Sequence, residues 1–177
     1  MDFCKVASCG NDNDSKTVAK DENKEKFDNT AIEDDTKFAV AAADGGMLEV
    51  ELGKLALTNA SSSKVKEFAQ MMVNDHGKAN DELKALAQTK NISLPAALSS
   101  KNQDRYSDMA KKKGADFDKD YTSFMVDDHK EDIEAFKKEA EKGKDAELKN
   151  WAASKVPVLE HHLMMAQAAD SIVRKNK

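Results

Sequence analysis

The sequence contains few of the residues that interrupt helices and build turns. Only two prolines and seven glycines occur among its 177 residues. Sheet proteins, which need many turns, use more of both, whereas the abundant Ala, Leu, Lys, Glu and Met favour long helices. The composition therefore predicts an all-α fold. The length suits a single domain with one substantial core.

Cysteine and the common catalytic motifs are scarce as well. Cys4 and Cys9 both precede the first periodic segment, so the core has neither a disulfide nor a cysteine metal site available. No nucleophile stands beside a base, and the sequence contains no glycine-rich phosphate loop and no readable pair of catalytic carboxylates. Any catalysis would have to use a bound metal ion, so we expect a binding or structural protein before an enzyme.

Excess positive charge is also missing. The net charge is −5, although charged residues make up 34% of the chain. Binding to nucleic acid requires a clustered positive field, so the charge argues against a nucleic-acid partner. The run from Lys111 to Lys113 is better interpreted as the solvated end of a helix.

The N-terminal segment carries a signal for export. Val6 to Cys9 resembles the lipobox of bacterial lipoproteins, in which the cysteine is lipidated, and Gly10 to Asp14 resembles the acidic stretch found after that cysteine in some of them. Met1 to Lys5 lacks the cationic start and apolar core of a signal peptide, as a misplaced start site or a trimmed sequence would explain. We expect a periplasmic or outer-membrane-associated lipoprotein anchored to the membrane through Cys9. The alternative is two incidental thiols in a disordered tail.

The polar segment after the lipobox is predicted to be a tether. From residue 10 to residue 29 the only apolar side chains are Val18, Ala19 and Phe27, too few to bury a core. We therefore divide the chain into residues 1–29, a lipobox-like remnant with a disordered polar tether, and residues 30–175, the folded domain.

The folded domain shows the hydrophobic period of long helices. The spacing predicts four of them, at about residues 31–59, 64–90, 116–142 and 146–175, and a shorter helix or crossover at about 96–113. The crossover lets the second and third long helices run parallel, as in a ferritin-like four-helix bundle. Gly45 and Gly46 indicate close approach of a neighbouring helix or a local kink, and Pro157 predicts a kink in the last helix.

Three histidines and one glutamate are the strongest candidates for a site. The opening of the segment Met72–His76 returns as Met125–His129, and helical spacing places both histidines on apolar faces. His162 is expected to point inward on the last helix and its neighbour His161 outward. Glu49 lies on a small-residue face of the first helix. We predict that His76, His129, His162 and Glu49 converge at mid-bundle, with Asp75, Asp128 and Glu51 as surrounding partners.

Several segments together resemble a known family. They are residues 38–56, the two Met-Val-x-Asp-His repeats, Phe117–Tyr121 and residues 156–163. They are similar to the bacterial ferritin-like family catalogued as domain of unknown function 4142, whose members are often labelled outer membrane proteins. The resemblance covers about residues 37–169. It implies a four-helix bundle and export from the cytoplasm, and it implies no established activity.

The ligand pattern departs from that of di-iron proteins. Such sites take Glu-x-x-His from two helices, but Val73, Val126 and Leu159 stand three residues before the histidines, so a di-iron site is disfavoured. A mononuclear site of three imidazoles and one carboxylate suits zinc, iron or copper. Thioethers one turn away from the histidines would favour copper(I). These are Met72, Met125 and Met165.

A second hypothesis needs no metal. Inward histidines in helical bundles are often core residues that donate to a carboxylate or a carbonyl group, and Glu49, Asp75 and Asp128 would serve as such partners. The chain would then be a structural or interaction lipoprotein that uses its charged outer faces. The sequence is compatible with both hypotheses.

Overall fold

The computed structural model describes residues 14–175, which form helices and no strands. The all-α prediction is therefore confirmed for this part of the chain. Cys4 and Cys9 lie outside the described residues. Within residues 14–175, no helix combines the length and apolarity needed to cross a bilayer. The elements are α1 (Ser15–Phe27), α2 (Glu33–Asn59), α3 (Ser63–Thr89), α4 (Ser100–Ala110), α5 (Gly114–Lys142) and α6 (Ala146–Lys175).

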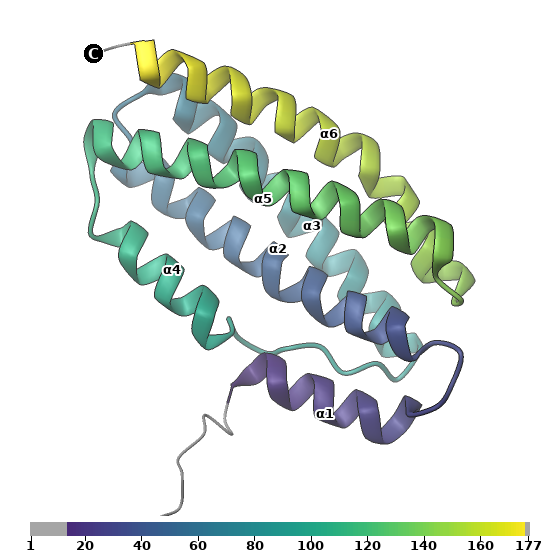
Figure 1. The fold of residues 1–177 in the computed structure, drawn as a ribbon. Coiled ribbons are helices and arrows are strands. Elements are labelled where there is room, and N and C mark those ends of the chain that lie inside the picture. The colour runs from purple at the N-terminus through teal and green to yellow at the C-terminus, as the bar shows by residue number, and fades with distance from the viewer. Residues whose placement is uncertain (1–13, 176–177) are drawn as a thin grey trace, which may run out of the picture.

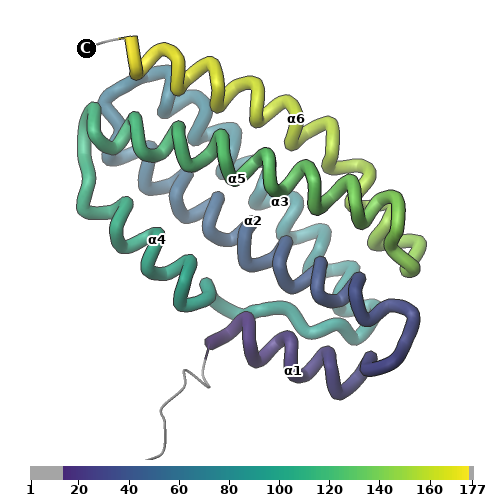
Figure 2. The backbone as a smooth tube through the Cα atoms, viewed as in Figure 1, coloured from purple at the N-terminus to yellow at the C-terminus, as the bar shows by residue number. Residues whose placement is uncertain are grey.

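The four long helices form a bundle with one crossover (Figure 1). Helices α2 and α3 form one antiparallel pair and α5 and α6 form another, while the loop before α4 and α4 itself return the chain along the bundle (Figure 2). As a result, α3 and α5 run parallel. This is the predicted arrangement of a ferritin-like bundle with a short helix in its crossover. Pro157 lies within the continuous helix α6.

Apolar clusters lie on both sides of the three histidines along their helices. On α3, His76 stands between Met72 and Leu83, which belong to different hydrophobic clusters. On α5, His129 likewise stands between Met125 and Ile133. On α6, His162 stands between Leu159 and Ala166, which also belong to different clusters. The imidazoles thus form one polar layer inside an otherwise apolar core.

Two glycines allow α2 and α3 to approach each other closely. A Cβ atom on Gly46 would collide with Asn80 Oδ1, and one on Gly53 would lie 2.8 Å from Val73 Cγ2 and 3.1 Å from the Ala69 carbonyl oxygen. A Cβ atom on Gly45 would meet nothing within 4 Å. Gly46 and Gly53 stand about one turn before and after Glu49. The neighbour of Gly46 is thus the end of a side chain of α3, whereas the backbone of α3 approaches α2 at Gly53.

Buried carboxylates hold the loops to the bundle. Asp118 accepts hydrogen bonds from the backbone N–H groups of Ser61 and Ser62 at 3.1 and 2.9 Å, and from the Ser61 hydroxyl at 2.5 Å. It therefore satisfies donors at the start of α3 that the helix itself leaves free. Two more acids act similarly: Asp35 accepts from the N–H groups of Lys144 and Asp145, and Asp44 accepts from the N–H and hydroxyl of Ser99.

Helix α1 corrects the prediction of a disordered tether for residues 14–29, and residues 10–13 lie outside the described part of the chain. From Ser15 the chain is helical and packs along α2. Asn23 is buried and exchanges two hydrogen bonds with the backbone of Ser93, at 2.8 and 2.7 Å. Ser15 Oγ accepts from the N–H groups of Ala96 and Ala97. Polar contacts with the distant crossover loop add to the burial of Ala19 and the packing of Phe27 in ordering this segment, and local composition does not reveal these contacts.

Candidate metal centre

Three histidines from three helices converge inside the bundle. The ring centroids of His76 and His162 are 5.0 Å apart, and that of His129 is 5.5 Å from each. One nitrogen from each ring lies within 4.8 Å of the other two. The residues are 7%, 0% and 1% exposed for His76, His129 and His162. The structure therefore brings the three sequence-predicted imidazoles together, and it leaves His161 exposed on the outer face of α6.

Glu49 of α2 joins two of these rings. Its Oε2 atom lies 2.7 Å from His76 Nδ1, and its Oε1 atom lies 3.5 Å from His129 Nε2. The residue is only 1% exposed, so water does not screen these contacts. All four residues predicted to form the site thus occupy one buried cluster.

The cluster is the middle of a longer chain of contacts. His76 Nε2 lies 3.1 Å from His162 Nδ1, and His162 Nε2 lies 2.9 Å from Asp75 Oδ2. At the opposite end, His129 Nδ1 lies 3.0 Å from the Met125 carbonyl oxygen. The chain therefore begins at a carbonyl group, passes through His129, Glu49, His76 and His162, and ends at a carboxylate.

The acceptors at both ends determine where the protons lie. Because the Met125 carbonyl only accepts, His129 Nδ1–H donates and His129 Nε2 carries a lone pair. Because Asp75 accepts, His162 Nε2–H donates and His162 Nδ1 accepts from His76 Nε2–H. Because the hydrogen of His76 is on Nε2, its Nδ1 atom carries none and can only accept. Its short contact with Glu49 Oε2 consequently requires a protonated Glu49.

The electrostatics of the cluster agree with this assignment. Burial raises the pKa of Glu49 well above its ordinary value. Burial also lowers the pKa of His76 to about 4 and that of His129 to about 3, and it lowers the pKa of His162. Burial therefore favours the neutral form of the carboxyl group and of the imidazoles.

One contact in this series of side chains has no hydrogen between its two atoms. Glu49 Oε1 and His129 Nε2 face each other as two acceptors at 3.5 Å, and neither atom has a hydrogen-bond partner within residues 14–175. Buried polar atoms are nearly always satisfied, so this orphaned pair marks a place where a cation could bind. A metal ion or an additional proton would satisfy both atoms.

Comparison with known proteins identifies the family. A family model described as domain of unknown function (DUF4142) matches residues 18–169, which is most of the chain. The chain belongs to this family. The family resemblance inferred from the sequence is thereby confirmed. Neither a curated protein nor a solved structure matches the chain. Membership of the DUF4142 family names no ligand or reaction, so the site itself must carry any functional argument.

The partners around the imidazoles of this DUF4142 domain differ in part from those expected. Asp75 on α3 orients His162 on α6, but Asp128 makes no hydrogen bond to an imidazole, and the Met125 carbonyl faces the second nitrogen of His129. The sequence offered no specific signal for this carbonyl. Glu51 does not belong to the cluster: its side chain is 42% exposed and pairs with Lys54 at 2.8 Å.

The methionines that stand one turn from the histidines in the sequence differ in their exposure. Met72 and Met125 are fully buried in the hydrophobic cluster that also contains Tyr121. Met165 is 36% exposed on α6. One of the three thioethers therefore lies partly at the surface.

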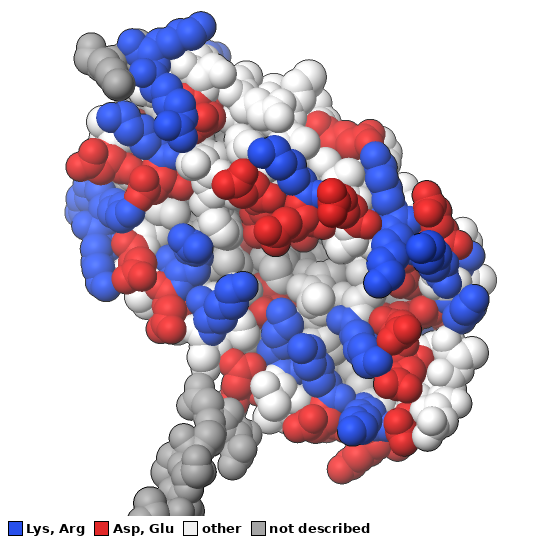
Figure 3. Space-filling model, viewed as in Figure 1, with Lys and Arg blue, Asp and Glu red and all other residues white. Residues whose placement is uncertain are grey.

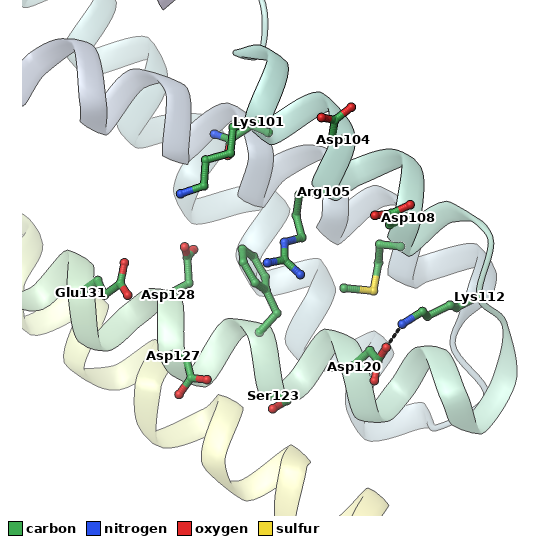
Figure 4. A pocket seen from close by; sticks show the side chains of 13 residues that line it. Lys101, Asp104, Arg105, Asp108, Lys112, Asp120, Ser123, Asp127, Asp128 and Glu131 are labelled. Atoms are coloured by element: carbon green, nitrogen blue, oxygen red, sulfur yellow. Dashed lines mark hydrogen bonds and ion pairs between the residues drawn. The ribbon is translucent and has the colours of Figure 1, made fainter.

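Two surface hollows approach the cluster from different sides. A pocket of about 170 Å³ between α3 and α6 is lined by Asp75, His76 and His162, among others. A larger groove of about 690 Å³ lies between α4 and α5 and is lined by Asp128 (Figure 4). Burial and the nearby Glu49 carboxyl group raise the pKa of Asp128 well above its ordinary value. The cluster is thus buried but close to solvent on two faces.

Proposed function

We propose that this domain binds one divalent transition-metal ion, with zinc as the best match, through His76, His129 and His162, and that Glu49 completes the site. The observation that carries the proposal is the facing pair of acceptors, Glu49 Oε1 and His129 Nε2, which have no hydrogen between them. A cation bound beside both atoms would remove their mutual repulsion. Three nitrogen donors and one oxygen donor suit zinc, with iron and copper(II) as competitors.

The outer nitrogens of the rings support this proposal. Histidine ligands of metal ions normally donate their second N–H to a carboxylate or a backbone carbonyl. His162 has Asp75 for this purpose, and His129 has the Met125 carbonyl. His76 Nδ1 faces Glu49 Oε2 at 2.7 Å, so this carboxylate would turn from the ring to the ion when it becomes the fourth ligand. Two of the three imidazoles thus have one nitrogen for the ion and an acceptor for the other.

The distances require only a small adjustment. Zinc–nitrogen bonds of about 2.0–2.1 Å separate the ligand nitrogens by roughly 3 to 4 Å. The present separations of up to 4.8 Å would close by about 1 Å, which small side-chain rotations provide. With Glu49 as the fourth ligand the coordination is closed, and closed sites hold their ion without offering it to a substrate. We therefore propose binding of the ion and not catalysis.

Export is part of the same proposal and is supported by the sequence alone. The lipobox-like segment ending at Cys9 would anchor the domain at the membrane, with the bundle facing the periplasm. The competing function is a structural lipoprotein whose histidines are satisfied core residues.

Metal analysis tests the proposed function. Protein purified without added metal should contain close to one transition-metal ion per chain, measured by plasma mass spectrometry. Zinc titration of the metal-free protein should give one tight site, and His129→Ala should weaken it by at least about a hundredfold because a ligand is lost. His161→Ala is the matched control, since this histidine is exposed and should leave the affinity unchanged. Equal affinity of wild type and His129→Ala would instead support the structural function.

A further inference from the structure

A second group of ligand atoms overlaps the three-histidine set. One atom each from Glu49, Asp128 and His129 lies within 4.8 Å of the other two. His129 belongs to both sets, and its Nδ1 atom is committed to the Met125 carbonyl. Its single remaining lone pair, on Nε2, binds one ion at a time. The two sets are therefore alternative positions for the same ion, an inner one of imidazoles and an outer one that contains two carboxylates.

Asp128 connects the outer position with solvent. It lines the groove between α4 and α5, where Figure 4 shows it pointing into the same space as Lys101 of α4. Behind it, Glu49 and His129 are only 1% and 0% exposed. Within residues 14–175, the Asp128 side chain forms no hydrogen bond or ion pair, although Glu49 Oε1 and His129 Nε2 behind it are also without partners. An ion in the groove would meet Asp128 before it reached this buried pair.

The charge of the two hollows favours the groove for a cation. Six acidic and three basic side chains line the groove. The smaller pocket beside His76 and His162 is lined by two lysines and one aspartate. Figure 3 shows acidic side chains gathered over α5 next to a hollow in the surface. A cleft lined mainly by negative charge raises the local cation concentration, whereas a positive one lowers it.

We propose that Asp128 is the capture ligand of the metal centre, and this inference rests on the metal-binding function proposed above. A hydrated divalent cation enters the groove between α4 and α5 and is first held by Asp128, Glu49 and His129. It then moves inward as His76 and His162 replace Asp128, while Glu49 and His129 remain bound. Stepwise replacement of water by carboxylate and then imidazole avoids stripping the ion in a single step.

The rates of zinc binding and release test this inference. Stopped-flow uptake into metal-free protein is compared for wild type, Asp128→Asn and Glu134→Gln. Glu134 is the matched control, because it is an exposed acid of α5 that does not line the groove. A group that acts only along the route changes both rate constants equally, so Asp128→Asn should slow association and dissociation by roughly tenfold each and leave Kd unchanged. Glu134→Gln should behave as wild type, and Asp128→Glu should restore the rates.

The inference has distinct ways to fail. Wild-type rate constants in Asp128→Asn would overturn it, as would a weaker Kd with unchanged association, which would make Asp128 a final ligand. Two tightly bound ions per chain would show that the inner and outer positions can be filled together, which contradicts the inference that they are alternatives. The salt dependence of zinc association to wild type gives a test that requires no variant. Added salt should slow association if the acidic groove attracts the ion, and unchanged or faster association would contradict this route. Absence of any zinc binding would refute the proposed function itself.

Discussion

Glu49 Oε1 and His129 Nε2 lie 3.5 Å apart inside the bundle, and neither has a hydrogen-bond partner among the described residues. Neighbouring groups hold both atoms in place: His76 contacts the other carboxyl oxygen, and the Met125 carbonyl accepts from the other ring nitrogen. Leaving buried polar atoms unsatisfied costs about 1–3 kcal/mol each. A cation coordinated by both atoms would remove this cost.

The partner of His162 is expected to tune metal affinity. Asp75 accepts the Nε2–H of His162 at 2.9 Å and so keeps its Nδ1 atom free for an ion. Asp75→Asn should weaken zinc binding by about 10- to 100-fold, the usual effect of losing such a partner. Competition with a chromophoric chelator measures this, with the exposed Asp81→Asn on the same helix as the control. Wild-type affinity in Asp75→Asn would show that the carboxylate does not support a ligand.

Two glycine substitutions test the close approach of α2 and α3. Gly53→Ala places a Cβ atom 2.8 Å from Val73 Cγ2 and 3.1 Å from the Ala69 carbonyl oxygen, so it should destabilise the fold by about 1–3 kcal/mol. Gly45→Ala meets nothing within 4 Å and should stabilise the helix by about 0.5–1 kcal/mol. Urea unfolding measures both changes. Shifts in the same direction would contradict the packing.

Glu139 is expected to make stability depend on pH. Burial, followed by repulsion from Asp35 and Asp145, raises its pKa from 4.5 to about 7. The folded state therefore binds more protons than the unfolded state between these values, and stability falls as the pH rises through this window. Glu139→Gln removes the charge, so it should be more stable than wild type by roughly 1–3 kcal/mol at pH 8 and similar to it at pH 4.

Unfolding by urea at both pH values measures this difference. Glu134→Gln is the control, because Glu134 lies exposed on the same helix. If wild type and Glu139→Gln lose stability equally between pH 4 and pH 8, Glu139 is not the responsible group.

The export proposal has its own measurement. Expression of the complete upstream reading frame in a bacterium, followed by mass spectrometry of the mature protein, should reveal a diacylated or triacylated N-terminal Cys9. Cys9→Ser should abolish the lipid and release the protein from the membrane fraction. An unmodified N-terminus on the wild-type protein would reject the anchor.

Periodicity was enough to predict the long helices and the inward side chains. The choice of His162 over His161 followed from helical neighbours, and Glu49 stood out on a face of small residues. The crossover length made parallel α3 and α5 feasible, and the structure has this arrangement. These features depend on local spacing, which a sequence displays directly.

Features that depend on distant partners could not be predicted in this way. Asn23 pairs with Ser93, and Asp118 pairs with Ser61 and Ser62, across at least 56 residues in each case. In the sequence these polar residues resemble exposed ones. The Met125 carbonyl beside His129 escaped prediction because every helical residue has a carbonyl four positions earlier. The role assigned to Glu51 was wrong for a related reason: a position at the edge of an apolar stripe also allows a solvent-facing pair with Lys54.

Calorimetric titration with zinc in buffers of different ionisation enthalpy tests the central claim most directly. If Glu49 is protonated in the metal-free cluster and ionised beside the bound ion, wild type should bind one ion per chain at pH 7 with release of about one proton from this group. Glu49→Gln, which has no such proton, should release about one proton fewer per ion. Absence of zinc binding to the wild type would contradict the proposed metal centre, and equal proton release by the two proteins would contradict the role of Glu49 in it.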